Sequence, residues 1–153
     1  MKRSRSVIRP KNGHHDERRG AAMVEMAVCF PVFMLMLLGI IEFGRAMMVS
    51  QLLTSAASEG CREAVIDGAT TSAVTTQVTS LVTNMVGCNS ADVDVVVTVT
   101  SLSSGSQLAD ISDAEQRDLV QIDVVVPFSA VSFAGGRFLN TANLRGRCVM
   151  RKE

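Results

Sequence analysis

The 153-residue sequence has no tryptophan, no tyrosine and only two histidines, His14 and His15. Aromatic residues make up only 4% of the chain, so a surface that stacks on bases or large ligands is poorly supported. The two adjacent histidines lack further ligands nearby, and we do not expect a metal site. The sequence after residue 20 has no histidine, which excludes Ser-His-Asp and Cys-His catalysis there. No phosphate-binding glycine loop or H-E-x-x-H motif occurs. We therefore predict a protein that is not an enzyme and needs no cofactor.

The formal net charge is zero, but the charges are unevenly distributed. Residues 1–20 contain seven Lys or Arg and two acids, whereas residues 21–153 contain eight Lys or Arg and thirteen acids. A basic flank before an apolar helix favours keeping that end of the chain in the cytoplasm. A nucleic-acid-binding arm is the alternative, but no aromatic residues are interleaved with the basic ones. We therefore predict a basic leader over residues 1–20, and no nucleic-acid partner.

An apolar run extends from Ala21 to Ile41 and is interrupted only by Glu25. About 20 apolar residues are enough for a helix to cross the hydrocarbon of a bilayer. A cleaved secretory signal would have an apolar core of about 7–15 residues and an A-x-A-like cleavage site. Here the run is longer, and Glu42-Phe43-Gly44-Arg45 follows it. The sequence thus predicts a membrane-spanning helix.

The single acid in the apolar run distinguishes between two interpretations of the membrane helix. A plain signal anchor explains the length of the run but has no use for Glu25. A pilin-type signal requires a basic leader, a small residue before the cut and an acid at the fifth mature position. Gly20 followed by Ala21 and, four residues later, Glu25 meets these requirements. We therefore interpret Gly20 and Ala21 as a processing site.

Three stretches of the sequence together resemble the TadE-like proteins, which are minor pilins, or pseudopilins, of the tight-adherence (Tad/Flp) pilus system of bacteria. The stretches are RRGAAMVEMA, FPVFMLMLLGIIEFGRAMM and LLTSAASEGCREAV. The resemblance is strong over about residues 18–68, and weaker through VVVPFSAVSF and CVMRKE to the end of the chain. One departure is Met26, because such signals often have an aromatic residue directly after the acid.

The resemblance implies a bacterial inner-membrane protein with a cytoplasmic N-terminus and an exported C-terminal domain. A prepilin peptidase would cut between Gly20 and Ala21, and the helix would then pack with other pilins and with pilus-assembly proteins in the lipid bilayer. Glu25 would be the docking acid of assembly. The alternative from the sequence is an uncleaved single-pass membrane protein whose exported domain binds a ligand or another protein.

The residues predict an α+β fold, which the resemblance implies is pilin-like, with a long helix over residues 21–67 that spans the membrane to about residue 41. After the membrane, apolar residues recur mostly every three or four positions, and Asp67-Gly68 is a helix stop. Glu42 and Arg45 lie one turn apart and could form an exposed pair of little energetic value. A second helix is predicted over residues 72–86. The residues of its expected apolar face are Val74, Val78, Leu81, Val82 and Met85.

The pattern then becomes alternating in ADVDVVVTVT, DLVQIDVVVP and LRGRCVMRK, which predicts a three-stranded antiparallel sheet with one solvent-exposed face. That face would carry acids on the first two strands and arginines on the third. Between the first two strands, SLSSGSQLADISDAEQRD is predicted to be a polar loop. Phe128, Phe133 and Phe138 are expected to cover the open end of the core. Residues 68–153 would thus form the small exported domain.

The four cysteines, Cys29, Cys61, Cys88 and Cys148, contain no C-x-x-C spacing, so neither a zinc site nor a thioredoxin-like motif is indicated. Cys29 belongs to the apolar run, and the other three would face an oxidising compartment. Cys61 lies on or beside the apolar stripe of the long helix, and Cys148 is in phase with the apolar residues of the last strand. We predict a disulfide between Cys61 and Cys148. The alternative is that both are reduced core residues.

Overall fold

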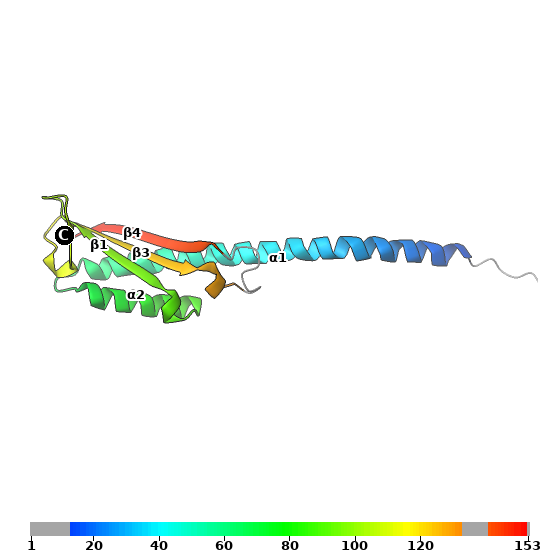
Figure 1. Ribbon diagram of the computed structural model, residues 1–153, viewed down its shortest axis with the longest axis horizontal. Coiled ribbons are helices and arrows are strands. Elements are labelled where there is room, and N and C mark those ends of the chain that lie inside the picture. The colour runs from blue at the N-terminus through cyan, green and yellow to red at the C-terminus, as the bar shows by residue number, and fades with distance from the viewer. Residues whose placement is uncertain (1–12, 133–140, 153) are drawn as a thin grey trace, which may run out of the picture. The chain divides into compact units, whose positions relative to one another are not determined.

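The computed structural model describes residues 13–132 and 141–152 of the chain, and the side chains from residue 20 onward. The chain divides into two units, Met1–Leu38 and Gly39–Glu153, which are described separately. The elements, labelled in Figure 1 where there is room, are α1 (Gly13–Ala64), α2 (Thr71–Val86), η1 (Ser90–Asp92), β1 (Asp94–Thr100), β2 (Gln107–Leu108), η2 (Ile111–Asp113), β3 (Leu119–Pro127), η3 (Phe128–Ala130) and β4 (Asn143–Arg151). The expected α+β fold is therefore confirmed.

Helix α1 is 52 residues long and contains Pro31 within its apolar part. It begins at Gly13, before the expected start at Ala21, and it ends at Ala64, three residues before the expected end. A turn follows, in which Ile66 N–H donates to the Glu63 carbonyl at 3.2 Å and Gly68 has a φ of 85°. Glycine adopts this left-handed conformation without steric cost, so Gly68 suits the turn that follows the helix.

Helix α2 begins one residue before its expected range and ends at Val86 as expected. The Thr70 side chain caps its first turn, and Gly87, with a φ of 77°, donates its N–H to the Thr83 carbonyl at its end. Its buried residues are Val74, Val78, Val82 and Val86. The predicted apolar face was wrong in part, because Met85 is 48% exposed and Val86 takes the core position instead.

The sheet has four antiparallel strands in the order β2-β1-β3-β4, one more than predicted. The three expected strands are present, and the additional strand is β2 within the expected polar loop. Its Leu108 and Gln107 pair with Val99 and Thr100 of β1. The turn between them is closed by Ser101 N–H, which donates to the Ser106 carbonyl at 2.9 Å. A strand of two residues is too short to produce an alternating pattern, so no pattern in the sequence predicts it.

The rest of that loop is held by a buried aspartate. Asp118 is 3% exposed, and its carboxylate accepts hydrogen bonds from the N–H groups of Leu102 at 3.0 Å and Glu115 at 2.9 Å. These bonds, that from Leu102 above all, lower the pKa of Asp118 below its ordinary value. Lys152, also buried, donates to the Ala114 carbonyl at 3.1 Å. The loop is therefore tied both to its own start and to the end of β4.

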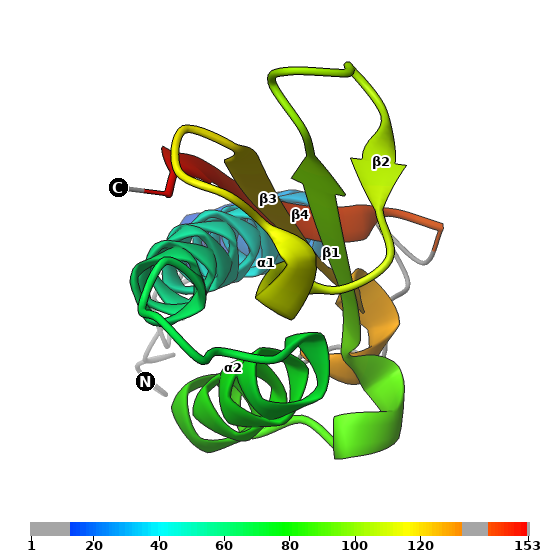
Figure 2. The same ribbon diagram turned by 90° about the vertical axis from the view of Figure 1, so that its left-hand side faces the viewer.

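Within the second unit, α2 and the last part of α1 lie side by side on one face of the sheet (Figures 1 and 2). The alternate residues of β3 that face these helices are completely buried: Val120, Ile122, Val124 and Val126. Burying such a side chain stabilises a fold by about 1.5–3 kcal/mol. The α1 residues in this core are mostly small: Val49, Leu53, Ala56, Ala57, Cys61 and Ala64. This composition lets α1 approach the sheet closely.

Two glycines lie where elements of this core approach each other closely. A Cβ atom on Gly146 of β4 would lie 2.2 Å from the backbone carbon of Leu53 in α1. A Cβ atom on Gly60 of α1 would lie 2.4 Å from Cγ2 of Val78 in α2. Real Cβ atoms do not come this close to other atoms. Glycine at these positions therefore lets β4 and α2 pack directly against α1.

The opposite face of the sheet is exposed and carries paired charges, as predicted. Asp123 of β3 lies directly across from Arg147 of β4, and the two form a salt bridge. Gln121 donates a second hydrogen bond to the Asp123 carboxylate at 2.6 Å. Partial burial raises the pKa of Asp123, but the bonds from Arg147 and Gln121 outweigh it, so the pKa lies below its ordinary value. A shift of one residue in register would move these charges into the core.

Candidate functional site

The apolar part of α1 has the length and composition of a membrane-spanning helix, as expected. The candidate span lies within Gly20–Ala64, and none of its most apolar 18-residue window is buried by other described parts of the chain. Large side chains along it are exposed, including Val24 at 67%, Phe30 at 54% and Phe33 at 54%. Such a row of exposed apolar side chains requires lipid or other helices around it.

Gly20, Ala21 and Glu25 all lie on α1, at the start of this apolar part. An added Cβ atom on Gly20 would have no neighbour within 4 Å, so a substitution there meets no obstacle inside the chain. Ala21 precedes Glu25 by four residues, which places both on the same face of the helix, one turn apart. Glu25 is itself exposed among apolar neighbours. The carboxylate is therefore accessible to a partner.

Glu42 and Arg45 do not form the exposed pair considered from the sequence, because Glu42 is only 2% exposed. Its carboxylate accepts a hydrogen bond from the Ser132 hydroxyl at 2.9 Å. Arg45 donates to the carbonyl of Val86 at 3.1 Å and to that of Val131 at 3.4 Å. The Val86 carbonyl is at the end of α2, where a cation is favoured by the helix dipole. These residues bind α1 to α2 and to the segment after η3.

Sequence reasoning missed this cluster, although one signal was available. The signal is the position of an acid and a base directly after an apolar run, where hydroxyls and backbone carbonyls of the second unit are within their reach.

Phe128, predicted to cover the core, is completely buried. Phe133 and Phe138, predicted to share that role, lie outside the described residues.

Cys61 and Cys148 lie close together between α1 and the sheet. Cys61 is completely buried, and Cys148 lies on β4 directly across from Ile122 of β3. Burial above all, together with a hydrogen bond with the Cys148 thiol, raises the pKa of the Cys61 thiol to about 12. Both are free thiols here, as are Cys29 and Cys88. The structure therefore places the predicted pair together and leaves its oxidation state as a prediction.

We expect non-reducing peptide mapping of protein purified from membranes to yield a peptide pair linked through Cys61 and Cys148. Closing a loop of roughly ninety residues would stabilise the domain by about 4–5 kcal/mol at most. The protonated Cys61 thiol is a poor nucleophile, so oxidation in air should be slow and should require a thiol-oxidising catalyst. A bridge from Cys88 within one chain, or thiols that stay free in the presence of such a catalyst, would contradict the assignment.

Among the residues that the structure describes, no group of three His, Cys, Asp or Glu side chains could hold a metal ion. Asp110, in the loop before η2, instead accepts bonds from Thr71 and Ser112, and these backbone bonds lower its pKa. The functional features of the chain are thus those of an apolar helix with one acid, joined to a small domain.

A family model described as TadE-like protein matches residues 20–62. This segment is TadE-like. It starts at Gly20, includes the whole apolar run with Glu25, and continues through the Glu42–Arg45 cluster to Cys61 of the core. The comparison with curated proteins and that with solved structures found no match. The TadE-like match supports a membrane-anchored protein associated with the Tad pilus, and this family is in general not enzymatic.

Proposed function

We propose that the protein is a minor pilin, or pseudopilin, that takes part in assembly of a Tad/Flp-type pilus for adherence to surfaces. The observation that carries this proposal is the spacing of Gly20, Ala21 and Glu25 at the start of the exposed apolar part of α1, within the TadE-like segment. A docking helix must be apolar enough for the bilayer and must present one acid to a partner. Both features occur in α1.

In the proposed topology, the basic leader stays in the cytoplasm and the apolar part of α1 crosses the inner membrane. The second unit is then exported. A prepilin peptidase removes residues 1–20, so that the mature chain begins with the amine of Ala21. Residues 21–41 then pack with other pilins and with assembly proteins in the bilayer.

Glu25 is proposed to pair with the free N-terminal amine of a neighbouring pilin. Two unit charges about 4 Å apart attract by about 1 kcal/mol in water and by about 4 kcal/mol at an effective dielectric constant of 20. The attraction is therefore useful only where lipid or helices exclude water. The alternative function, an uncleaved membrane protein with an exported binding domain, has no role for this acid.

The Gly20→Trp variant is expected to keep its leader, because a bulky side chain blocks access of the peptidase to the backbone at the cut. Its intact mass, measured on membrane-extracted protein, should exceed that of the wild type by about 2 kDa, the mass of twenty residues. The same substitution at Gly39 is a matched control, since Gly39 also lies on α1 with no atom within 4 Å of an added Cβ.

The Gly39→Trp variant should be processed normally. If the wild-type chain itself retains its leader, the pilin proposal is wrong and the uncleaved membrane protein is supported instead. N-terminal sequencing makes the same distinction, because only the pilin proposal gives a chain that starts at Ala21.

A further inference from the structure

Among the described residues, both edges of the sheet lack a partner strand along most of their length. No strand pairs with the outer side of β4, which is nine residues long. On the other side, β2 pairs with β1 only at Val99 and Thr100, so residues 94–98 of β1 have no partner on that edge. Exposed strands of this kind are templates for pairing with another chain. We propose that β4 of one copy pairs with β1 of a second copy, in parallel, so that one sheet continues from copy to copy.

The direction of the backbone groups shows which residues face each free edge. At the two ends of β4, the Ala142 carbonyl accepts from Phe128 N–H at 2.9 Å, and Lys152 N–H donates to the Asp118 carbonyl at 2.9 Å. Even-numbered residues of β4 therefore bond to β3, and odd-numbered ones face outward. Ser101 N–H, after β1, donates toward β2 at 2.9 Å. Val95 and Val97 of β1 thus face the free edge.

This alternation selects a parallel pair. In parallel pairing, an outward-facing residue bonds to the two neighbours of the residue opposite it. Arg147 or Val149 of β4 would then lie opposite Asp94 or Val96 of β1, and all four side chains are on the exposed face of the sheet. An antiparallel pair would place Val95 or Val97 opposite them, and these two valines face the core. The second copy would then be turned over, with its helices on the opposite face.

A parallel pair also keeps α1 running in the same direction in both copies. Two copies anchored in one membrane by their apolar segments require this arrangement. This step rests on the proposed function, whereas the alternation of backbone groups does not. Pairing of β4 with β4 of a second copy in antiparallel fashion would make the two α1 helices run in opposite directions.

The exposed side chains of the two edges are complementary. Arg145, Arg147 and Arg151 line β4, so two β4 strands side by side would place like charges together, which is destabilising. Asp94 of β1 is exposed and of opposite charge. If Arg147 lies opposite Asp94, the next exposed residues in the same register are Val149 and Val96. These two valines are 49% and 47% exposed, and the pairing would cover both.

The helices below the two edges have flanks of matching character. At the β4 edge, Ser50 of α1 donates to the Arg145 carbonyl at 3.4 Å, which places this flank of α1 beside the strand. One and two turns later, the Thr54 and Ser58 hydroxyls donate to carbonyls four residues earlier, at 3.0 and 2.9 Å. The flank is therefore small, uncharged and already hydrogen-bonded.

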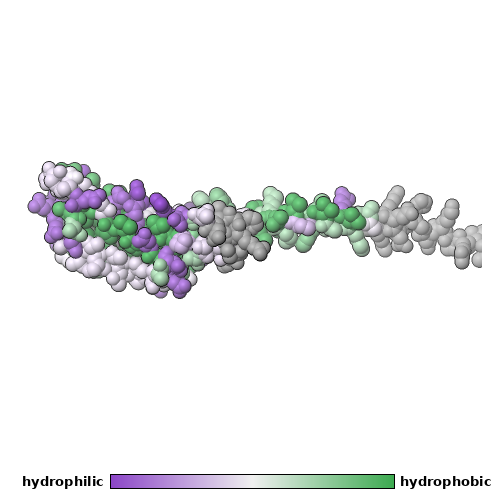
Figure 3. All heavy atoms as spheres, in the orientation of Figure 1, coloured by the Kyte–Doolittle hydropathy of each residue, from purple (hydrophilic) through white to green (hydrophobic). Residues whose placement is uncertain are grey.

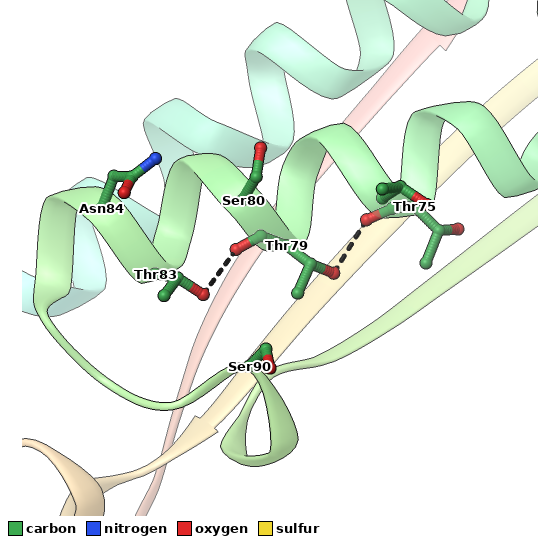
Figure 4. Close-up of a pocket in the computed structure, with 7 residues that line it drawn as sticks. Thr75, Thr79, Ser80, Thr83, Asn84 and Ser90 are labelled. Carbon is green, nitrogen blue, oxygen red and sulfur yellow. Dashed lines mark hydrogen bonds between the residues drawn. The ribbon is translucent and has the colours of Figure 1, made fainter.

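At the β1 edge, α2 presents a similar flank. Thr75, Thr79, Thr83 and Ser90 line an open groove of about 440 Å³ between α2 and η1 (Figure 4). The Thr79 and Thr83 hydroxyls each donate to the carbonyl four residues earlier, both at 2.8 Å. Helix α2 has no charged residue, and hydrophobic residues gather in a band over β1 above it (Figure 3). Packing α1 of one copy against α2 of the next would leave these hydroxyl donors satisfied.

The proposed contact uses different surfaces on the two copies. A heterologous interface of this kind joins more than two copies, in a ring or an open array, rather than forming a symmetric dimer. Each copy offers β4 to one neighbour and β1 to another. The proposal can therefore be tested by measuring how many copies become linked when the contact is cross-linked.

The test is disulfide cross-linking of the full chain in membranes, with cysteines introduced by Val96→Cys and Val149→Cys together. Mild oxidation should give a ladder of dimers, trimers and larger species on a non-reducing gel. Within one copy, β3 separates the two positions by two strand spacings, about 10 Å, which is too far for a disulfide. The wild-type chain, with its own four cysteines, is the control for background products.

The single variants distinguish the proposed contact between β4 and β1 from contacts between identical strands. Val96→Cys alone and Val149→Cys alone should give no product beyond the wild type, and dimers from Val149→Cys alone would show β4–β4 pairing and overturn the proposal. Adding Asp94→Arg to the double variant should reduce the ladder severalfold, because Arg147 would then face a like charge. Asp67→Arg, which changes an exposed acid in the turn after α1, is the matched control and should leave the ladder unchanged.

Absence of a ladder from the double variant, or a ladder unaffected by Asp94→Arg, would overturn the edge pairing. Both substituted valines are exposed, so the domain should fold in every variant. The cross-link reports contact between domains and does not depend on leader removal or on Glu25. If it fails while the leader is removed normally, the proposed function stands and only the edge pairing is wrong.

Discussion

The Glu25→Ala variant is expected to insert into the membrane as the wild type does and to reduce adherence to the level of a deletion strain. Insertion should not suffer, because removing an acid makes a membrane segment more favourable in lipid. Assembly should fail, because the proposed partner amine would remain in a low-dielectric environment without its counter-charge. Adherence of a complemented deletion strain, together with membrane fractionation, measures both effects.

The matched control is Glu59→Ala, which removes an exposed acid from the same helix outside the apolar segment. This variant should adhere normally. Glu25→Gln adds a second comparison, since it keeps the size of the side chain and removes only the charge, and it should behave like Glu25→Ala. Normal adherence with Glu25→Ala would mean that Glu25 is not the docking acid, even if the leader is removed as proposed.

The Gly146→Ala variant is expected to destabilise the second unit severely. The new methyl group would lie within 2.2–2.5 Å of the backbone of Leu53 and Thr54, and neither α1 nor β4 can move away without losing the rest of the core. Overpacking of this kind costs about 3 kcal/mol, which is a large part of the stability of a small domain. The midpoint of thermal unfolding should fall by about 10 °C or more.

Trypsin provides a direct readout, because Arg145, Arg147 and Arg151 lie in β4 and are cut only when this strand opens. Cleavage of the detergent-solubilised chain should be much faster for Gly146→Ala than for the wild type. Gly44→Ala is the control, since an added Cβ there has no neighbour within 4 Å and alanine favours a helix. Equal cleavage rates for Gly146→Ala and the wild type would contradict the close packing of α1 against β4.

The long-period features of the fold could be predicted from the sequence, because each one repeats a physical pattern over many residues. The apolar run predicted α1, and strict alternation in β3 predicted that Val120, Ile122, Val124 and Val126 form the core. Strand β2 could not be predicted, because its two residues are defined by a turn and by pairing with β1. The core face of α2 was assigned to Met85 in place of Val86, because several nearby apolar residues fit a helical period equally well.

The residues of the candidate site also fall into those that could be predicted from the sequence and those that could not. The spacing of Gly20 and Glu25 is local, so the sequence alone was enough to find it. The cluster of Glu42 and Arg45 was missed because its partners, Val86 and Ser132, are far away in the chain. The proximity of Cys61 and Cys148 was predictable from the phases of a helix and a strand that pack together, but the pKa of the Cys61 thiol depends on how deeply that packing buries it.

The packing of β4 against α1 also implies an order of events if the domain is exported as proposed. The core residues Val49 to Ala64 of α1 directly follow the apolar segment, whereas Gly146, which contacts Leu53, comes more than ninety residues later in the chain. In the proposed topology, the domain cannot complete its sheet until β4 has crossed the membrane. Contacts between distant segments form slowly. Until then, the newly exported chain exposes its valine-rich strands in the periplasm, where a chaperone or an already folded neighbour would have to shield them.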